Sequence, residues 1–183
     1  LNEHFRWNNN LNKNVIEILA GYSMDGFFNG FWAELLTGGW LELFIKNLLV
    51  KHGNELKIHD VQKGIRVSKG GTEVPNELDV VFMKGTSFNI VECKTGKQDH
   101  GGKPIDVFYK LEAIKKQFGA LRIKSYLVSA SGSILDKNNA IQSSIKQRAD
   151  LYNCTILPSS LIRNLANSKD EEQFKILQLD IRD

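Results

Sequence analysis

Asp79, Glu92 and Lys94 are the residues of this chain whose types and spacing could do chemistry. They lie in two apolar, β-branched segments, residues 76–82 and 88–94, and the turn-forming residues between these segments predict a β-hairpin. Such a hairpin brings the two carboxylates close together. Because neighbouring carboxylates repel each other and resist burial, a pair of them beside a lysine is typical of a site that hydrolyses phosphodiester bonds with a divalent cation.

The predicted strand that ends at Lys94 also decides which side chains share a face. Side chains alternate along a strand, so Glu92 and Lys94 point to one face and Cys93 points to the other. Acidic oxygen ligands select Mg²⁺ or Mn²⁺ over a soft metal. The four histidines show no metal-ligand spacing, so zinc is not expected, and the two cysteines, Cys93 and Cys154, are interpreted as reduced core residues.

A third acid, Glu42, lies in the first turn of a helix predicted over residues 40–51, where apolar residues recur at helical spacing. The helix dipole favours a carboxylate in a first turn, so an ordinary glutamate on a solvated face is the alternative. Glu42 is the only acid in this apolar helix, which favours a metal ligand or a metal-proximal acid. Glu34, in a similar Gly/Trp/Glu sequence upstream, competes for this role.

The rest of the chain alternates between helical and strand periodicity and predicts an α/β sandwich. Helices are expected over residues 11–36, 40–51, 106–118 and 137–152 and from residue 159, and strands near residues 56–67, 78–94, 124–130, 154–157 and 174–181. The glycine-rich residues 64–71 match neither a phosphate-binding loop nor a dinucleotide fingerprint.

Positive charge is concentrated after the candidate site. From Lys94 to Arg148 the sequence has eleven Lys and Arg against four Asp and Glu, although the net charge of the chain is only +3. Such a surface would attract a phosphate backbone, whereas solvated lysines on amphipathic helices are the alternative. Lys97, in the polar loop after Lys94, and Lys110, on the next predicted helix, are candidates to contact the substrate; a snorkelling lysine is the other interpretation of Lys110.

Five short motifs occur in an order and spacing that resemble one family, the nuclease domain of the CARF-domain CRISPR ancillary nucleases of type III systems. The motifs are residues 38–42, 76–80, 92–95, 109–112 leading to 118–120, and 146–149. This family is part of the restriction-endonuclease-like, or PD-(D/E)xK, superfamily, and several ordered motifs are more specific than one. The chain departs from the expected pattern at Ala120, where a second glycine is expected after Gly119.

The resemblance implies an α/β fold with a restriction-endonuclease-like core, a central mixed β-sheet flanked by helices, and a metal-dependent endonuclease acting on DNA or RNA. In the mechanism that we expect, one or two Mg²⁺ or Mn²⁺ ions are held by Asp79, Glu92, the backbone carbonyl of Cys93 and Glu42. Lys94 orients or activates the attacking water. The family also makes Arg148 a candidate for substrate binding.

The resemblance further implies an antiviral effector that acts as a homodimer and is switched on by a cyclic oligoadenylate. The sensor domain that binds this activator is not recognisable in the sequence, which begins at Leu1, so we expect an excised or partial protein. The alternative is a stand-alone relative with a processed or disordered start. The length of the chain predicts one domain with a small extension. We expect a helical extension or linker over residues 1–37 and the nuclease domain over residues 38–183.

Composition predicts a soluble intracellular protein, because 42% of the residues are hydrophobic, 25% are charged, and neither a membrane-length apolar run nor a secretory leader is visible. The family resemblance implies the cytoplasm of a bacterium or an archaeon. Two other functions are compatible with the sequence. One is a restriction, repair or junction-resolving nuclease with the same acids. The other is a catalytically inactive module for nucleic-acid binding or dimerisation.

Overall fold

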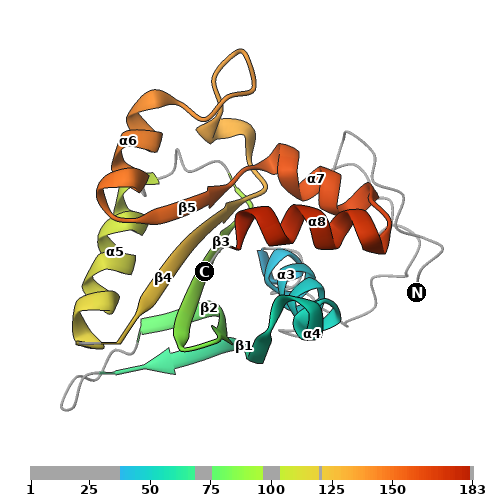
Figure 1. Ribbon diagram of the computed structural model, residues 1–183. Coiled ribbons are helices and arrows are strands. Elements are labelled where there is room, and N and C mark those ends of the chain that lie inside the picture. The colour runs from blue at the N-terminus through green and yellow to red at the C-terminus, as the bar shows by residue number, and fades with distance from the viewer. Residues whose placement is uncertain (1–37, 69–75, 97–103, 120, 182–183) are drawn as a thin grey trace, which may run out of the picture.

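The fold is built around a five-stranded sheet with helices on both faces (Figure 1). The computed structural model describes residues 38–68, 76–96, 104–119 and 121–181. The helices are α3 (Trp40–Lys51), α4 (Gly53–Leu56), α5 (Pro104–Gln117), α6 (Ser143–Leu151), α7 (Ser159–Asn167) and α8 (Asp170–Asp180), with a 3₁₀ turn at Gly132–Ile134. The strands are β1 (Ile58–Val67), β2 (Asn76–Lys84), β3 (Ser87–Lys94), β4 (Ile123–Ser129) and β5 (Cys154–Leu157).

The sheet has the order β1-β2-β3-β4-β5 and is mixed, which confirms the expected architecture. β1, β2 and β3 are antiparallel neighbours, whereas β4 and β5 run parallel to β3. The β2–β3 pair is the predicted hairpin, and it closes at the pair Lys84 and Ser87. Gly85 adopts a φ of +55° in the turn, a conformation that glycine reaches without strain. β3 therefore has an antiparallel neighbour on one side and a parallel neighbour on the other.

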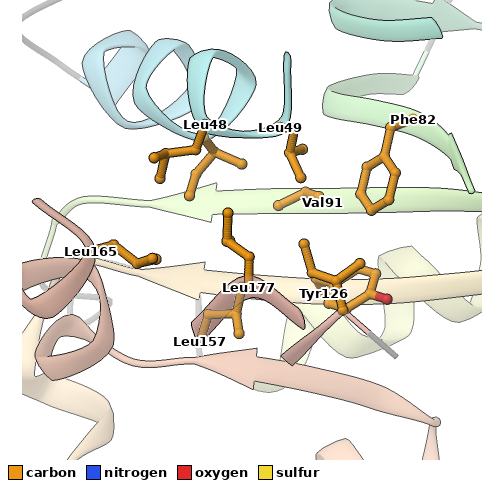
Figure 2. Close-up of a pocket in the computed structure, with 10 residues that line it drawn as sticks. Leu48, Leu49, Phe82, Val91, Tyr126, Leu157, Leu165 and Leu177 are labelled. Carbon is orange, nitrogen blue, oxygen red and sulfur yellow. The ribbon is translucent and has the colours of Figure 1, made fainter. Parts of the chain in front are cut away.

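Apolar residues form one core on each face of the sheet. The first core lies between the sheet and α3, α4, α7 and α8, and the second lies between the sheet and α5 and α6. In the first core a small apolar cavity of about 20 Å³ is enclosed by side chains such as Leu48, Leu49, Phe82, Val91 and Leu177 (Figure 2). These side chains come from α3, β2, β3 and α8, so the cavity lies where the helical layer meets the centre of the sheet.

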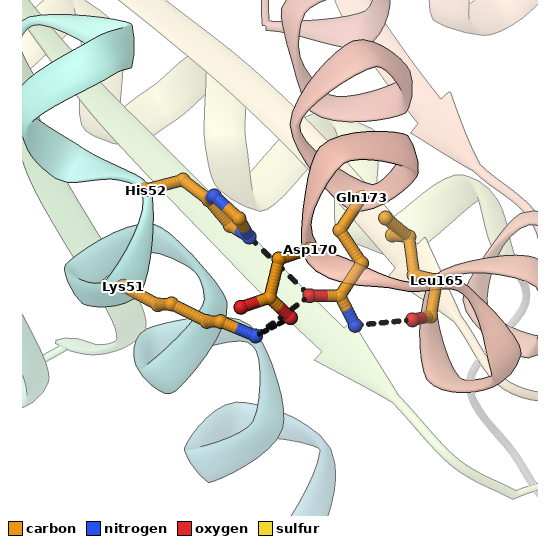
Figure 3. Close-up of polar contacts among 5 residues, drawn as sticks. All are labelled: Lys51, His52, Leu165, Asp170 and Gln173. Atoms are coloured by element: carbon orange, nitrogen blue, oxygen red, sulfur yellow. Dashed lines mark hydrogen bonds and ion pairs between the residues drawn. The ribbon is translucent and has the colours of Figure 1, made fainter.

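A polar contact joins the end of α3 to α7 and α8 (Figure 3). Gln173 donates from its amide nitrogen to the carbonyl oxygen of Leu165 at 2.8 Å, which fixes its own amide oxygen as an acceptor. That oxygen accepts from Lys51 at 3.1 Å and lies 3.3 Å from Nε2 of the buried His52. Lys51 also pairs with Asp170 at 2.6 Å. These contacts fasten the C-terminal helices over the first core.

One expected element is wrong, and another is shorter than expected. Residues 174–181 were expected as a strand but lie in α8 and its C-terminal end, because Gln173, Leu177 and Ile181 are buried at helical spacing. The helix expected over residues 137–152 is shorter, since α6 spans Ser143–Leu151. Asp136 accepts from the backbone N–H groups of residues 138 and 140 and builds a turn before it.

Further expectations concern other parts of the chain. The helix expected over residues 11–36 lies outside the described residues, as does the greater part of the loop that follows Lys94. The strand expected from residue 56 begins at Ile58, because the short helix α4 precedes it. Within the part of the chain that the structure describes, no helix is both long and apolar enough to cross a membrane.

Candidate active site

Asp79 lies where the regular pairing of β2 with β3 ends. The last pair before it is Val80 with Val91, and beyond that pair the carboxylate of Asp79 accepts the backbone N–H of Cys93 at 2.7 Å. Side-chain alternation also breaks at this point, because Leu78 packs in the second core and Val80 in the first. The side chain of Asp79 thus takes the position of a backbone acceptor, and its carboxylate is held against β3.

Glu92 is a buried anion between two cations. Its side chain is 3% exposed, and its two oxygens accept from Lys94 and from Lys110, each at 2.7 Å. Lys94 lies on the same strand, whereas Lys110 reaches across from α5. A buried carboxylate is costly unless it is paired and hydrogen-bonded. The central strand therefore carries a charge whose burial depends on two lysines from different elements.

The two acids influence each other. Burial and then the charge of Glu92 raise the pKa of Asp79 to about 6, although the Cys93 N–H and the two lysines act in the opposite direction. Burial disfavours the charge of Lys94, but Glu92 and Asp79 outweigh it and hold the pKa of Lys94 above its ordinary value. At neutral pH Lys94 is therefore an ammonium group that can donate hydrogen bonds but cannot readily accept a proton.

Glu42 lies in the first turn of α3, and its charge acts on Cys93, the residue between Glu92 and Lys94. Its carboxylate pairs with Lys63 of β1 at 2.9 Å, and the two side chains are only 20% and 26% exposed. Burial raises the pKa of the Cys93 thiol, and the charges of Asp79, Glu42 and Glu92 raise it further. All three acids therefore lie around Cys93.

The structure brings together four of the predicted site residues and places a fifth, Arg148, on another helix. Asp79, Glu92, Lys94 and Lys110 form one hydrogen-bonded and electrostatically coupled group. Arg148 lies on α6, where its charge acts on Tyr152, and no interaction found among the described residues joins it to Glu92. Lys97 lies outside the described residues.

Both cysteines are core residues, as was expected from the sequence. Cys93 and Cys154 are buried free thiols, and Cys93 packs in the first core, opposite in direction to Glu92, as the alternation of the strand predicts.

Lys63, which pairs with Glu42, was not predicted as a residue of the site. The register of β1 places it opposite Val80, the residue after Asp79, so the signal was a lysine in the middle of a predicted strand.

The residues at the site fit a hard divalent cation in their donor chemistry. Asp79 and Glu92 offer carboxylate oxygens, which Mg²⁺ and Mn²⁺ prefer, and the repulsion that raises the pKa of Asp79 is the repulsion that a cation would relieve. As the side chains stand, no group of three or more His, Cys, Asp or Glu within the described ranges converges on a single point. The two-carboxylate pair is therefore the centre of the candidate metal site.

The mixed sheet, with Asp79, Glu92 and Lys94 together where the hairpin ladder ends, has the arrangement that was expected for a domain of the PD-(D/E)xK type. Residues 31–164 match the family described as the Card1-like endonuclease domain, and the chain belongs to this family. This match confirms the resemblance to the nuclease domain of CRISPR ancillary nucleases. The chain is thus a CRISPR-associated nuclease domain.

Two solved structures share the fold. The crystal structure of protein VC1899 from Vibrio cholerae is 24% identical with a TM-score of 0.65, and the match covers 94% of this chain and 44% of that one. Can2 from Sulfobacillus thermosulfidooxidans, in complex with cyclic tetra-adenylate, is 21% identical with a TM-score of 0.63, and the match covers 94% of this chain and 47% of Can2. The chain therefore spans less than half the length of either protein. No curated protein matches its sequence significantly.

Proposed function

We propose that this domain hydrolyses phosphodiester bonds in DNA or RNA in a reaction that depends on Mg²⁺ or Mn²⁺. The observation that carries the proposal is the buried Glu92, held between Lys94 and Lys110 beside an Asp79 whose pKa is raised to about 6. Such charges inside a sheet cost stability, and a module that only binds or dimerises gains nothing from them.

The proposed roles follow from where the groups lie. Asp79, Glu92 and the backbone carbonyl of Cys93 would hold the cation, and Glu42 would act as a metal-proximal acid. When bound, a divalent cation lowers the pKa of a water ligand and neutralises charge on the phosphoryl oxygens. Because the pKa of Lys94 is raised, its ammonium group would orient the attacking water and the phosphate by donating hydrogen bonds, and would not act as a base.

The biological setting is proposed from the family and from the fold. In this proposal the domain is part of an antiviral effector in the cytoplasm of a bacterium or an archaeon, acts as a homodimer, and is controlled by a cyclic-oligoadenylate sensor outside this chain. Support comes from the family match and from the cyclic tetra-adenylate in the Can2 complex. Lys97, Lys110 and Arg148 would contact the substrate backbone.

The test is a cleavage assay on supercoiled plasmid, single-stranded DNA and single-stranded RNA with Mn²⁺, with EDTA as one control. Lys94→Ala is the test variant, and Lys116→Ala is its matched control, because Lys116 is a 77% exposed lysine that pairs only weakly with Glu112. We expect metal-dependent cutting that Lys94→Ala abolishes and Lys116→Ala retains. A wild-type domain that neither cuts nor binds Mn²⁺ in calorimetry would overturn the proposal.

A further inference from the structure

Both carboxylate oxygens of Glu92 already accept a hydrogen bond from an ammonium group. Oε1 accepts from Lys94 and Oε2 from Lys110, each at 2.7 Å. The side chain is 3% exposed, so water has little access to these oxygens. A divalent cation that takes an oxygen of Glu92 must therefore displace one of the two lysines, or share the oxygen with it against their mutual repulsion.

Lys110 is the lysine that can leave. Both lysines interact with Asp79, but Lys94 is anchored two residues along the same strand as Glu92, and its charge interacts with Cys93 as well. Lys110 reaches Glu92 from a separate element, α5, through a flexible four-carbon stem, so it can leave without disturbing β3. Asp106 and Ala113, one turn before and one turn after Lys110 on α5, are exposed, so this side of the helix borders solvent. A rotation of the Lys110 side chain would bring its ammonium group to the side from which a substrate arrives.

The charges at the site favour displacement of Lys110 by a divalent cation only when a phosphate is also present. Among the residues that the structure describes, the site has three acids, Asp79, Glu92 and Glu42, and three lysines paired or coupled with them, Lys94, Lys110 and Lys63. A divalent cation would add an excess of positive charge to this balanced group. The negative charge of a phosphodiester would compensate for it, and a displaced ammonium group would find a new partner in the phosphate oxygens.

We propose that Lys110 is an exchangeable counter-ion, which holds Glu92 until a divalent cation binds and then contacts a phosphate of the nucleic acid. Metal and nucleic acid would therefore bind cooperatively, each more tightly in the presence of the other. The inference rests on the proposed function and adds a specific task for one residue of α5. It makes Lys110 a competitor of the metal as well as a contact of the substrate.

The first test is calorimetric titration of Mn²⁺ into the domain without nucleic acid at pH 7.5. Because the cation no longer has to displace a charge-assisted hydrogen bond, Lys110→Met should bind Mn²⁺ about tenfold more tightly or better than wild type. Lys116→Met removes the same charge from the exposed face of the same helix and should leave the affinity unchanged. Lys110→Arg keeps the cation at the site and should stay near wild type.

The second test measures cooperativity. Binding of a fluorescent single-stranded oligonucleotide is followed by anisotropy with and without Ca²⁺, which takes the same oxygen ligands, and a gel verifies that the oligonucleotide stays intact. Ca²⁺ should tighten binding to wild type about tenfold, and this gain should shrink in Lys110→Met, which lacks the phosphate contact. An equal gain in both proteins would overturn the inference.

The outcomes separate this inference from the proposed function. Metal-dependent cutting together with an unchanged Mn²⁺ affinity in Lys110→Met would overturn the exchange and leave the nuclease assignment intact. A wild-type domain that binds no Mn²⁺ and cuts nothing would overturn both. If Lys110→Met does not fold, Lys110→Gln replaces it, since a neutral amide can still donate to Glu92, and a smaller increase in Mn²⁺ affinity is expected because that hydrogen bond is weaker.

Discussion

The carboxylate of Asp79 accepts the backbone N–H of Cys93 at 2.7 Å, beyond the point where the β2–β3 ladder ends at Val80 and Val91. One side chain therefore has two tasks. It satisfies a backbone donor of the central strand, and it presents a charge beside Glu92. Substitutions at this position can separate the structural task from the chemical one.

Asp79→Asn should abolish cutting and leave the domain folded. The amide oxygen of asparagine can still accept the Cys93 N–H, whereas the charge that would bind a cation is gone. Asp79→Ala loses both, and its free energy of unfolding should lie about 1 kcal/mol or more below that of Asp79→Asn, because a backbone donor is left without its partner. Urea denaturation and the plasmid assay measure the two effects; wild-type cutting by either variant would contradict the assignment.

The raised pKa of Asp79 predicts a pH dependence with a definite sign. The pKa rises from 3.8 to about 6 on folding, so between these values the folded chain binds more protons than the unfolded chain. This group therefore favours folding most strongly at low pH, and its contribution is lost as the pH rises from about 4 to about 6. Urea denaturation from pH 4 to pH 7 should show this slope in wild type and a flatter profile in Asp79→Asn.

Metal binding should have the opposite pH dependence. Only the ionised carboxylate of Asp79 can bind a cation, and a proton competes with the metal below about pH 6. Cleavage and Mn²⁺ affinity should thus fall by up to about tenfold per pH unit below pH 6 and level off above it. A cleavage rate that stays constant from pH 5 to pH 7, with wild-type folding throughout, would argue against Asp79 as a ligand.

Glu42 and Lys63 should be coupled in a double-mutant cycle. The partners are 20% and 26% exposed and 2.9 Å apart, so a coupling energy of about 0.5–1 kcal/mol is expected from Glu42→Gln, Lys63→Met and the double variant. Glu42→Gln should also slow cleavage, because it removes a charge near the proposed cation. Additive effects on stability in urea denaturation would show that the pair contributes nothing.

Gln173→Ala should destabilise the domain without changing the chemistry. The substitution leaves His52 and the carbonyl oxygen of Leu165 without their partner in the buried contact of Figure 3, at a cost of about 1–3 kcal/mol. Gln178→Ala, at an exposed position of the same helix, is the matched control. Mn²⁺ affinity of the folded protein should be the same in all three proteins. A shift in that affinity would link α8 to the site.

The part of the site that lies on the β2–β3 hairpin could be predicted from the sequence, because it depends on residues close together in the chain. The hairpin follows from two apolar runs around a Gly85 turn, and the alternation within β3 places Glu92 and Lys94 on one face. The partnership of Glu42 with Lys63 could not be predicted, because it depends on how α3 packs across β1. Arg148 was a candidate only through the family resemblance, and its role stays a prediction.

The wrong strand at residues 174–181 has a simple cause. Phe174 and Ile176, and then Leu177, Leu179 and Ile181, alternate with polar residues in two short runs, which fits a strand as well as a helix over so few positions. The acids at the start of α8 favour a helix, and the contact of Gln173 with Lys51 and His52 fastens that helix to α3. The sequence of this segment fits strand periodicity and helix periodicity almost equally well, and the tertiary contacts of Gln173 decide for the helix.

The position of β3 between an antiparallel and a parallel neighbour has a consequence for how the site is assembled. The hairpin that brings Asp79 to Glu92 closes over a two-residue turn, so it can form early and locally. Lys110 comes from α5, in the crossover that leads from β3 to the parallel strand β4. We therefore expect that the two acids meet before their second lysine during folding, and that docking of α5 is the step that makes burial of Glu92 tolerable.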